Sequence, residues 1–373
     1  MVDILSKKKI MFVLPRMNGG GAERVISILA NRLCDRRDVT VLVLVSQESF
    51  YSLDDRVRFI SADFKVNRTN RFFRIISLAA NFLRSVFFVR KQISKINPHI
   101  VFSVLEETDI VTYLAMLGKK ETARVCSERN DPTKRSRLMQ FILKKIYQNS
   151  DCLVCQSATV SDFYSNVPDS RKKVIPNPVD FSKYPERVSE GEKKRVVGVG
   201  RLREQKNFRM LIDSFALVAE QHSDVDLVIY GEGSQREELE RRISELGLEG
   251  RVELPGASRQ VLADIRDATV FVMSSDYEGF PNALVEAIAV GVPVISTDFP
   301  TGIARDIIKE DVGIVIPCGD KNALANALET LLSQPEKRRY IRENGYKSVC
   351  EFETDKVVEM WDELFASLEM SGI

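Results

Sequence analysis

Short apolar runs alternate with longer amphipathic stretches along most of this chain of 373 residues. Apolar runs bounded by Gly, Pro or charged residues are expected to be strands, and the amphipathic stretches between them to be helices. The expected strands are 10–14, 39–45, 57–60, 98–103, 123–127 and 151–156 in the first half, and 196–200, 225–230, 251–254, 270–273, 293–296 and 313–317 in the second. This alternation predicts an α/β fold with parallel sheets and helices on both faces.

A proline-rich segment, Pro176–Asp180, separates the two halves and is the expected hinge. A chain of this length is too long for one ordinary core and suits two domains. We therefore expect an N-terminal domain at 1–176 and a C-terminal domain at 177–350. The last part of the chain is expected to form two helices within 336–365, and the segment 351–373 to cross back to the first domain.

The segment 270–296 has the pattern of a strand, a polar loop, a helix and a second strand. Pro281 suits the first turn of the helix expected at 282–290, because its missing N–H group is not needed there. A helix N-terminus after a strand forms an anion site, because unpaired N–H groups and the helix dipole point outward. Glu278 and Glu286, eight residues apart, would accept hydrogen bonds from hydroxyl-rich ligand parts such as a ribose or a hexose.

Two other junctions between a strand and a helix carry ligand-binding features. Arg201 and Lys206 follow the strand at 196–200, and a guanidinium with an ammonium suits a diphosphate. After the strand at 10–14, three successive glycines at 19–21 would let the backbone approach a ligand closely.

Four motifs carry a family resemblance. Residues 278–287 read E-G-F-P-N-A-L-V-E-A, with the two glutamates in an E-x7-E spacing, and 291–296 read G-V-P-V-I-S. The other three are G-G-A-E-R at 20–24, I-P-N-P-V-D at 175–180 and G-R-L-R-E-Q-K-N at 200–207. On these motifs the chain resembles the retaining glycosyltransferases of family 4, from Gly19 to the terminal helices. The resemblance implies a GT-B fold, with two Rossmann-like, doubly wound domains facing each other across a cleft.

The resemblance also implies a reaction and its residues. A hexose or N-acetylhexosamine would move from a nucleotide-sugar, expected to be a UDP-sugar, with retention at the anomeric carbon. Arg201 and Lys206 would bind the diphosphate, Glu278 the transferred sugar and Glu286 the ribose. The other donor-binding residues implied are Gly20, Gly21, Gly231, Phe280, Pro281, Asn282, Ala283 and Leu284. No metal and no cofactor is implied, because the cations and helix N-termini would neutralise the leaving group.

The loop after the strand at 123–127 departs from the family pattern. Many relatives carry a histidine in an S-E-H-like sequence, whereas this chain has Arg129 after Ser127 and Glu128. Glu128 and Arg129 are therefore candidates for the acceptor side. Two alternatives stay open. A GT-B-type sugar-nucleotide epimerase would need acid/base groups over the sugar, and two histidines in the whole chain argue against it. A catalytically silent, glycosyltransferase-like binding subunit would be consistent with Arg129.

Charge is divided unevenly along the chain. Residues 1–176 hold 30 Lys and Arg against 17 Asp and Glu, a net +13, and residues 177–373 hold 24 against 36, a net −12. The segment Lys65–Lys95 has eight Lys and Arg, no acidic residue and many phenylalanines, as in a helix that lies on an anionic membrane. A crossover helix of the sheet is the alternative, and both hold if 67–74 projects from the domain. Nucleic acid is disfavoured, because the phenylalanines have helical spacing in an apolar face.

These features predict a cytoplasmic enzyme, peripheral on the inner face of a membrane. No signal sequence and no transmembrane segment is expected. The resemblance implies a glycan acceptor, lipid-diphosphate-linked, in bacterial envelope polysaccharide synthesis. Cys152 and Cys155 stand three apart on an expected strand and should face opposite sides, which favours neither a metal site nor a disulfide. Asp224 and Asp226 precede their strand, which is the wrong end for a D-x-D metal motif.

Overall fold

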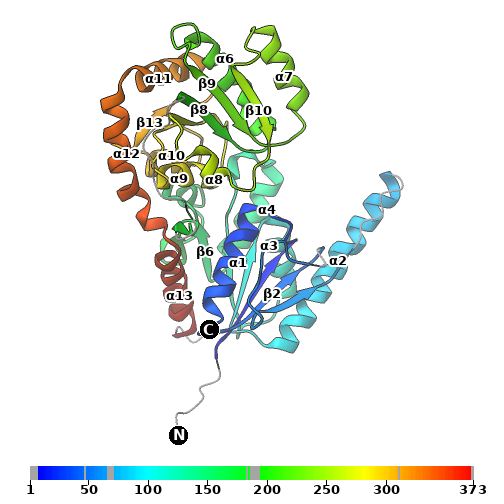
Figure 1. The fold of residues 1–373 in the computed structure, drawn as a ribbon. Coiled ribbons are helices and arrows are strands. Elements are labelled where there is room, and N and C mark those ends of the chain that lie inside the picture. The colour runs from blue at the N-terminus through cyan, green and yellow to red at the C-terminus, as the bar shows by residue number, and fades with distance from the viewer. Residues whose placement is uncertain are drawn as a thin grey trace. The chain divides into compact units, whose positions relative to one another are not determined.

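The computed structural model describes residues 7–45, 48–64, 71–181, 184, 194–309 and 311–370, without the side chains of 71–76. The chain divides into two compact units. Unit 1 consists of Met1–Pro178 and Thr354–Ile373, and unit 2 consists of Val179–Glu353. Each unit contains one parallel sheet covered by helices (Figure 1), which confirms the predicted α/β class.

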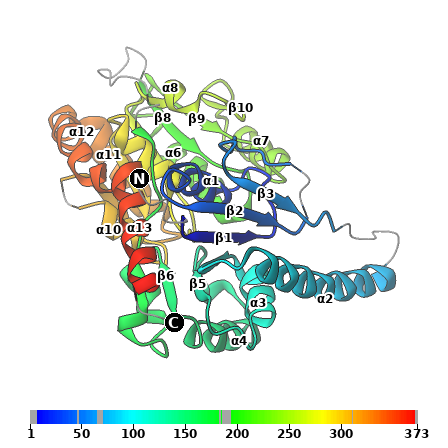
Figure 2. The same cartoon turned by 90° about the horizontal axis from the view of Figure 1, so that it is seen from below.

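The unit 1 sheet has the order β3-β2-β1-β4-β5-β6-β7, and every neighbouring pair is parallel. Its strands are β1 (Lys9–Leu14), β2 (Asp38–Val43), β3 (Arg58–Ser61), β4 (Ile100–Val104), β5 (Ala123–Ser127), β6 (Cys152–Cys155) and β7 (Lys172–Val174). Its helices are α1 (Gly21–Leu33), α2 (Arg71–Ile96), α3 (Glu106–Ala115), α4 (Arg137–Gln148), α5 (Ala158–Phe163) and α13 (Thr354–Met370). Figure 2 shows α2, α3 and α4 on one side of this sheet and α1 on the other.

The unit 2 sheet has the order β10-β9-β8-β11-β12-β13, again all parallel. Its strands are β8 (Lys194–Val199), β9 (Val225–Tyr230), β10 (Val252–Gly256), β11 (Val270–Met273), β12 (Val294–Thr297) and β13 (Gly313–Ile316). Its helices are α6 (Phe208–Val218), α7 (Arg236–Glu245), α8 (Val261–Ile265), α9 (Asn282–Ala289), α10 (Ile303–Ile307), α11 (Lys321–Ser333) and α12 (Pro335–Val349).

Both sheets share the strand order of a doubly wound fold. In each, the chain adds strands outward on one side of its first strand and then returns to the other side. The order therefore reverses between β1 and β4 in unit 1, and between β8 and β11 in unit 2. Ligands of such sheets bind outside the carboxyl ends of the strands at this reversal. The loops that follow these four strands are the places to look for a site.

Alternation along the strands builds a core on each face of the sheets. In β1, Ile10 and Phe12 join one buried cluster, whereas Met11 and Val13 join another. Cys152 and Cys155 of β6 likewise belong to different clusters, so they face opposite sides, as predicted.

The last helix, α13, completes the core of unit 1. Its buried side is Val357, Trp361, Leu364 and Phe365. The Trp361 ring centroid lies 4.8 Å from that of Phe102 on β4. Asp362 on the same helix forms ion pairs of 2.8 and 2.7 Å with Arg36 and Arg37, which follow α1. The terminal segment is thus a structural part of unit 1.

Helix α2 is a crossover helix that extends past its own sheet. Val89, Ile93 and Ile96 pack in the cluster of Met11 and Val13, which confirms the crossover role. Leu78 and Phe82 are exposed, although they lie on the same stripe of the helix as Val89 and Ile93. The first part of the described helix therefore has no sheet beneath it. The segment 65–70 and the side chains of 71–76, on which the predicted membrane contact partly depends, lie outside the described residues. Among the described helices, none is long and apolar enough to cross a membrane.

Candidate active site

Two loops at the strand reversal of unit 2 bring the predicted donor-binding residues together. The first loop, 200–207, joins β8 to α6, and the second, 274–281, joins β11 to α9. Because β8 and β11 are parallel neighbours, their carboxyl ends lie at the same edge of the sheet. Arg201 and Lys206 come from the first loop and Glu278 from the second. The site is thus assembled at the position that the fold favours for ligands.

An ion pair joins the two loops. Lys206 Nζ donates to Glu278 Oε1 at 2.6 Å, and the side chains are 17% and 10% exposed. Ser275 Oγ donates to the same Oε1 at 2.7 Å. Glu278 Oε2 has a single long contact, from Gln205 Nε2 at 3.4 Å. An ammonium has three donors and a carboxylate oxygen two acceptor sites, so each partner keeps hydrogen-bonding capacity for a ligand while the pair holds its geometry.

Further hydrogen bonds fix the two loops to each other. Asp276 N donates to Gln205 O at 2.9 Å, and Gln205 Nε2 donates to Tyr277 O at 2.9 Å. Asn207 Nδ2 donates to Asp276 Oδ1 at 2.9 Å. Ser274 Oγ donates to the carbonyl oxygen of Lys206 at 2.8 Å. Because side chains and backbone both contribute, the positions of Lys206 and Glu278 are set by the loops rather than by free rotation of long side chains.

Glycines make room for this arrangement. A Cβ on Gly200 would lie 2.8 Å from Lys206 Cε, so the absence of a side chain at Gly200 leaves room for the side chain of Lys206. A Cβ on Gly231, in the loop after β9, would lie only 1.8 Å from the carbonyl oxygen of Gly200. Packing therefore requires a glycine at position 231, because no side chain fits there. Its role in donor binding stays a prediction.

Arg201 differs from Lys206 in its surroundings. Its side chain is exposed, and within the described residues no ion-pair or hydrogen-bond partner of its guanidinium is recorded. Its position beside Gly200 places it at the same strand end as the ion pair. Arg201 is thus the cation available to an incoming anion, whereas Lys206 is already anchored.

Helix α9 begins at Asn282, as expected, and Pro281 is the residue before it rather than a part of its first turn. Asn282 N donates to Phe280 O at 3.0 Å, and Leu284 N donates to Pro281 O at 2.9 Å. Two of the three amides at 282–284, which were predicted as donor-binding positions, are therefore engaged, and Ala283 N has no partner among the described residues. The side chains of Phe280 and Leu284 are buried in the core of unit 2, so any ligand contact at these positions must come from the backbone.

Glu286 lies on α9, half-buried, within its second turn. The helix carries it, whereas Glu278 sits in the loop before the helix. Thr301 Oγ1 donates to the carbonyl oxygen of Glu278 at 3.0 Å and supports that loop from the segment after β12. The E-x7-E spacing thus puts one carboxylate on a braced loop and the other on the helix that follows.

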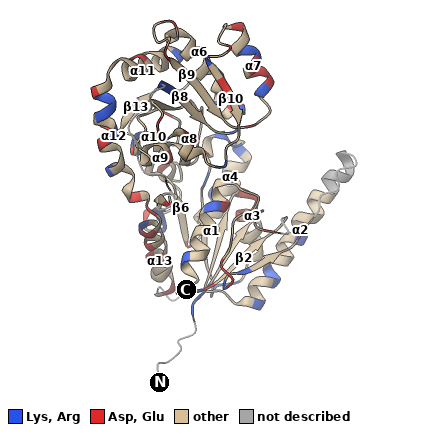
Figure 3. Cartoon of the chain, in the orientation of Figure 1, with Lys and Arg blue, Asp and Glu red and all other residues tan. Residues whose placement is uncertain are grey.

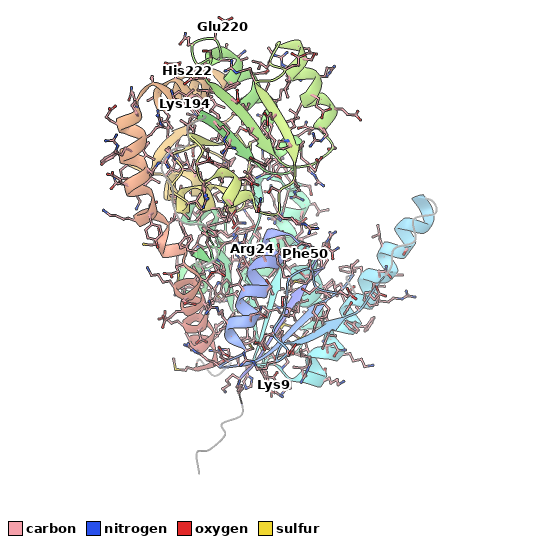
Figure 4. All side chains as sticks on the ribbon, viewed as in Figure 1. Lys9, Arg24, Phe50, Lys194, Glu220 and His222 are labelled. Carbon is pink, nitrogen blue, oxygen red and sulfur yellow. The ribbon has the colours of Figure 1, made fainter. Side chains whose placement is uncertain are left out.

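The glycine turn of unit 1 joins β1 to α1. Gly19 has φ +101°, which favours glycine, and Gly20 precedes the helix. Gly20 N donates to Glu23 Oε2 at 2.9 Å, so a buried carboxylate already lies at the N-terminus of α1. Gly20 and Gly21 are exposed, and their contact with a donor stays a prediction. Figure 4 labels Arg24 and Phe50 near this end of the sheet and Lys9 at the opposite end.

Glu128, a candidate for the acceptor side, is part of a buried network. Its side chain accepts from Arg135 Nη2 at 2.7 Å, from Arg135 Nη1 and Tyr164 Oη at 2.5 Å each, and from Asn130 N at 3.1 Å. Contact with Glu128 and burial together raise the pKa of the Tyr164 hydroxyl far above its usual range, with burial the larger cause. Both carboxylate oxygens are used, so Glu128 braces the loops after β5 instead of facing an acceptor.

Arg129, the second acceptor-side candidate, is a buried cation without a carboxylate partner in the described part of the chain. Nη1 donates to Asn177 Oδ1 at 2.6 Å, and Cζ lies 5.6 Å from the Trp361 ring centroid. Nε and Nη2 are buried without a hydrogen-bond partner. Burial lowers the pKa of Arg129 to about 10. The residue at the usual histidine position thus remains a cation at neutral pH and cannot serve there as a general base.

The other titratable groups singled out in the sequence lie elsewhere. Asp224 pairs with Lys194 at 2.9 Å and Asp226 with Arg251 at 3.3 Å, both at the amino ends of unit 2 strands. Lys194 and His222 mark this end in Figure 4. His222 contacts Glu329 at 2.7 Å, and His99 Nδ1 accepts from Lys9 N at 3.1 Å. These contacts are structural.

Four residues that support the site were not among the predicted ones, namely Gln205, Asn207, Ser275 and Thr301. The first two lie within the G-R-L-R-E-Q-K-N motif. Asn207 has φ +46° and caps α6, so a polar residue before an apolar run was the available signal. Ser275 contacts Glu278 within the same loop and carries no distinctive pattern. Thr301 carries no signal either, because its contact with Glu278 depends on the pairing of β11 with β12.

Comparison with known proteins identifies the family. Residues 19–183 match the Glycosyltransferase Family 4 domain, and residues 180–348 match the domain of the Glycosyl transferases group 1. The chain belongs to glycosyltransferase family 4. A Campylobacter jejuni enzyme is 29% identical to this chain, and the match covers 97% of this chain and 99% of that enzyme. That enzyme is named as an α-1,4-N-acetyl-D-galactosaminyltransferase acting on a GalNAc-GalNAc-diNAcBac-diphospho-undecaprenol. This chain is 24% identical over 94% of its length to 97% of a second C. jejuni N-acetylgalactosaminyltransferase with a diphospho-undecaprenol acceptor.

Solved structures agree on the fold of this glycosyltransferase. A sucrose-phosphate synthase from Thermosynechococcus elongatus superposes with a TM-score of 0.83, at 18% identity, over 98% of this chain and 100% of that one. Anabaena Alr3699/HepE, solved with UDP-glucose, gives a TM-score of 0.76 at 19% identity, over 96% and 99% of the two chains. The fold is GT-B, as the motifs implied.

Proposed function

We propose that this glycosyltransferase moves a hexose or N-acetylhexosamine from a UDP-sugar to a lipid-diphosphate-linked glycan, with retention and without a metal. The observation that carries the proposal is the Lys206–Glu278 pair beside the exposed Arg201, at the strand reversal of unit 2. An anchored ammonium and an exposed guanidinium suit a diphosphate, and a braced carboxylate with a largely unused Oε2 suits a sugar hydroxyl.

The chemistry would then be mainly electrostatic. Negative charge grows on the diphosphate as the bond to the sugar breaks, and Arg201 and Lys206 would stabilise it more in the transition state than before it. Glu286 would accept hydrogen bonds from the ribose. The backbone N–H of Ala283 would add a hydrogen-bond donor at the start of α9. The departing phosphate oxygen would take the proton of the acceptor.

The relatives support the donor and the acceptor. Anabaena Alr3699/HepE was solved with UDP and with UDP-glucose, and the two C. jejuni relatives carry diphospho-undecaprenol acceptors in their names. Membrane contact through Lys65–Lys95 belongs to the same proposal. In the described part of α2, Leu83 and Phe87 are exposed and Arg90 and Lys91 lie nearby. Figure 3 shows Lys and Arg, without Asp or Glu, along this part of the helix.

The test is a transfer assay with a panel of UDP-sugars, each with and without a glycan linked to diphospho-undecaprenol in mixed micelles. The expected result is acceptor-dependent release of UDP and an α-configured product by NMR. Interconversion of the donor without an acceptor would favour the epimerase instead. Donor binding by calorimetry with no turnover on any acceptor would favour a silent binding subunit.

A further inference from the structure

A second basic and apolar surface lies on unit 1, away from Lys65–Lys95. Between Asp131 and Asp151 the chain has five Lys and Arg and no acidic residue. Most of this segment is α4, which begins after Ser136, whose hydroxyl accepts from Met139 N at 3.3 Å. The inner side of α4 carries Leu143, Ile146 and Tyr147, which pack in the core between α4 and β6. This packing fixes which side of the helix faces outward.

The outward side of α4 carries two large apolar residues among cations. Leu138 and Phe141 are 69% and 61% exposed and lie three residues apart, so they are neighbours on one face. Arg137 and Lys145 are exposed on the same helix, one residue before Leu138 and four residues after Phe141. Lys144 is less available, because its Nζ lies 4.5 Å from the Phe163 ring centroid. Arg135 does not belong to this face, because its guanidinium is held by Glu106 and Glu128. Leaving a leucine and a phenylalanine in water costs free energy, and cations beside them favour an anionic covering.

The neighbouring helices extend this surface. Helix α3 packs against both α2 and α4, so the three form one layer over the same face of the sheet. On α2 the exposed apolar residues are Leu78, Phe82, Leu83 and Phe87, and Leu117 follows α3. Figure 2 shows the three helices side by side along one side of unit 1. A flat partner could therefore touch α2 and α4 together, as a bilayer surface would.

We propose that the outer face of α4 docks on an anionic lipid bilayer, with Leu138 and Phe141 inserted between the head groups and Arg137 and Lys145 on the phosphates. The inference rests on the proposed lipid-linked acceptor and adds a second attachment point to α2. With two attachment points, the helical layer of unit 1 lies along the membrane plane. The enzyme is then fixed in orientation, not only in distance, relative to an acceptor anchored in that membrane.

The first experiment is co-sedimentation of the full chain with vesicles of phosphatidylglycerol and phosphatidylcholine. Leu138→Ser with Phe141→Ser should weaken binding by about tenfold or more, because inserted apolar area is lost. The matched control is Leu217→Ser with Tyr340→Ser, which removes two apolar residues of unit 2 that are 52% and 56% exposed. The control should bind as the wild type does. Equal binding by the α4 variant and the wild type would overturn the inference.

Charge and insertion are tested separately. Arg137→Glu with Lys145→Glu should weaken binding about tenfold or more, whereas the charge-preserving pair Arg137→Lys with Lys145→Arg should keep it. Phe141→Trp should give an indole whose emission shifts to the blue with vesicles and is quenched by brominated lipid. The native Trp361 is fully buried and should not respond. An unshifted, unquenched indole, or concentration-dependent dimerisation through this face in sedimentation analysis without lipid, would contradict membrane docking.

Activity assays separate this inference from the proposed function. The Leu138→Ser/Phe141→Ser variant should transfer sugar to a short-chain, water-soluble diphosphate-linked glycan at the wild-type rate, and to the same glycan on undecaprenol in vesicles at a much lower rate. Lipid binding through α4 with no transfer to either acceptor would remove the proposed function and leave the docking surface standing. Equal rates on both acceptors would overturn the docking.

Discussion

The two units share a strand order but use their polar residues differently. In unit 2, the loops at the strand reversal present Arg201 to solvent and hold Lys206 and Glu278 at the edge of the sheet. In unit 1, Asp109 after β4 and Glu128 after β5 are turned inward, where Glu128 accepts hydrogen bonds from Arg135 and Tyr164. The outer helices α2 and α4 carry exposed cations, among them Lys91 and Lys145. Unit 2 thus leaves a cation exposed beside an ion pair at its strand reversal, whereas the buried charges of unit 1 are used in contacts within that unit.

The largest effect is expected from crowding the unit 2 loops. Gly231→Ala would bring a Cβ 1.8 Å from the carbonyl oxygen of Gly200, so the backbone must move. We expect a loss of about 3 kcal/mol or more in the free energy of unfolding, together with loss of donor binding. Gly247→Ala is the control, because Gly247 has φ +65° and open space around its Cα, and should cost only about 1 kcal/mol. If urea unfolding gave similar losses of stability for Gly231→Ala and Gly247→Ala, backbone strain at positive φ would explain both, and the collision with Gly200 would not.

The next effect concerns the cation that both loops hold. Lys206→Ala removes a charge-assisted contact to the diphosphate worth about 1.5–3 kcal/mol, so kcat/KM should fall about 10- to 150-fold with the fold intact. Glu286→Ala should lower turnover similarly, through the ribose. The neighbouring exposed Arg203→Ala serves as control and should stay within about twofold of wild type. Wild-type kinetics for Lys206→Ala would remove this lysine from the site.

A third test addresses the inward charges of unit 1. Asp109 is fully buried, accepts from Ser103 Oγ at 2.6 Å and Tyr147 Oη at 2.9 Å, and burial raises its pKa to about 7. In the unfolded chain this carboxyl ionises near pH 4. Between about pH 4 and 7 unfolding therefore releases a proton, and the free energy of unfolding falls as the pH rises through that range.

Asp109→Asn should remove this pH dependence. The free energy of unfolding of the variant minus that of the wild type should increase by on the order of 2–4 kcal/mol from pH 4 to pH 8, measured by urea unfolding. Glu107→Gln, an exposed change on the same helix, is the control. Donor binding by unit 2 should be unchanged in both variants. A stability difference between Asp109→Asn and wild type that is the same at both pH values would mean that Asp109 is ionised in the folded protein.

Short local patterns were enough to predict the strands of both sheets except β7, which is only three residues long. The hinge at Pro176–Asp180 and the contact of Lys206 and Glu278 with a ligand stay predictions. The ion pair between those two residues was not predictable, since it depends on β8 and β11 lying side by side. The burial of Glu128 depends on Arg135 and on Tyr164, 36 residues away, so sequence alone left it looking like a loop residue facing a ligand. The helix expected at 282–290 begins at Asn282 as predicted and ends one residue early, at Ala289, which is the usual uncertainty of a helix end.

The smallest effect is expected from chelation. If Arg201 and Lys206 neutralise the diphosphate, EDTA should change the rate of sugar transfer by less than about twofold. The acidic pair that most resembles a metal motif, Asp224 and Asp226, is engaged by Lys194 and Arg251 at the amino ends of its strands, away from the candidate site. Asp224→Asn with Asp226→Asn should likewise leave the rate unchanged in the presence of EDTA. Full loss of transfer with EDTA, restored by Mg²⁺ or Mn²⁺, would show that a metal shares the diphosphate with the two cations. Unit 2 would then differ from unit 1 in binding a metal. The acidic side chains of the 274–281 loop, Asp276 and Glu278, would be the first candidates for its ligands.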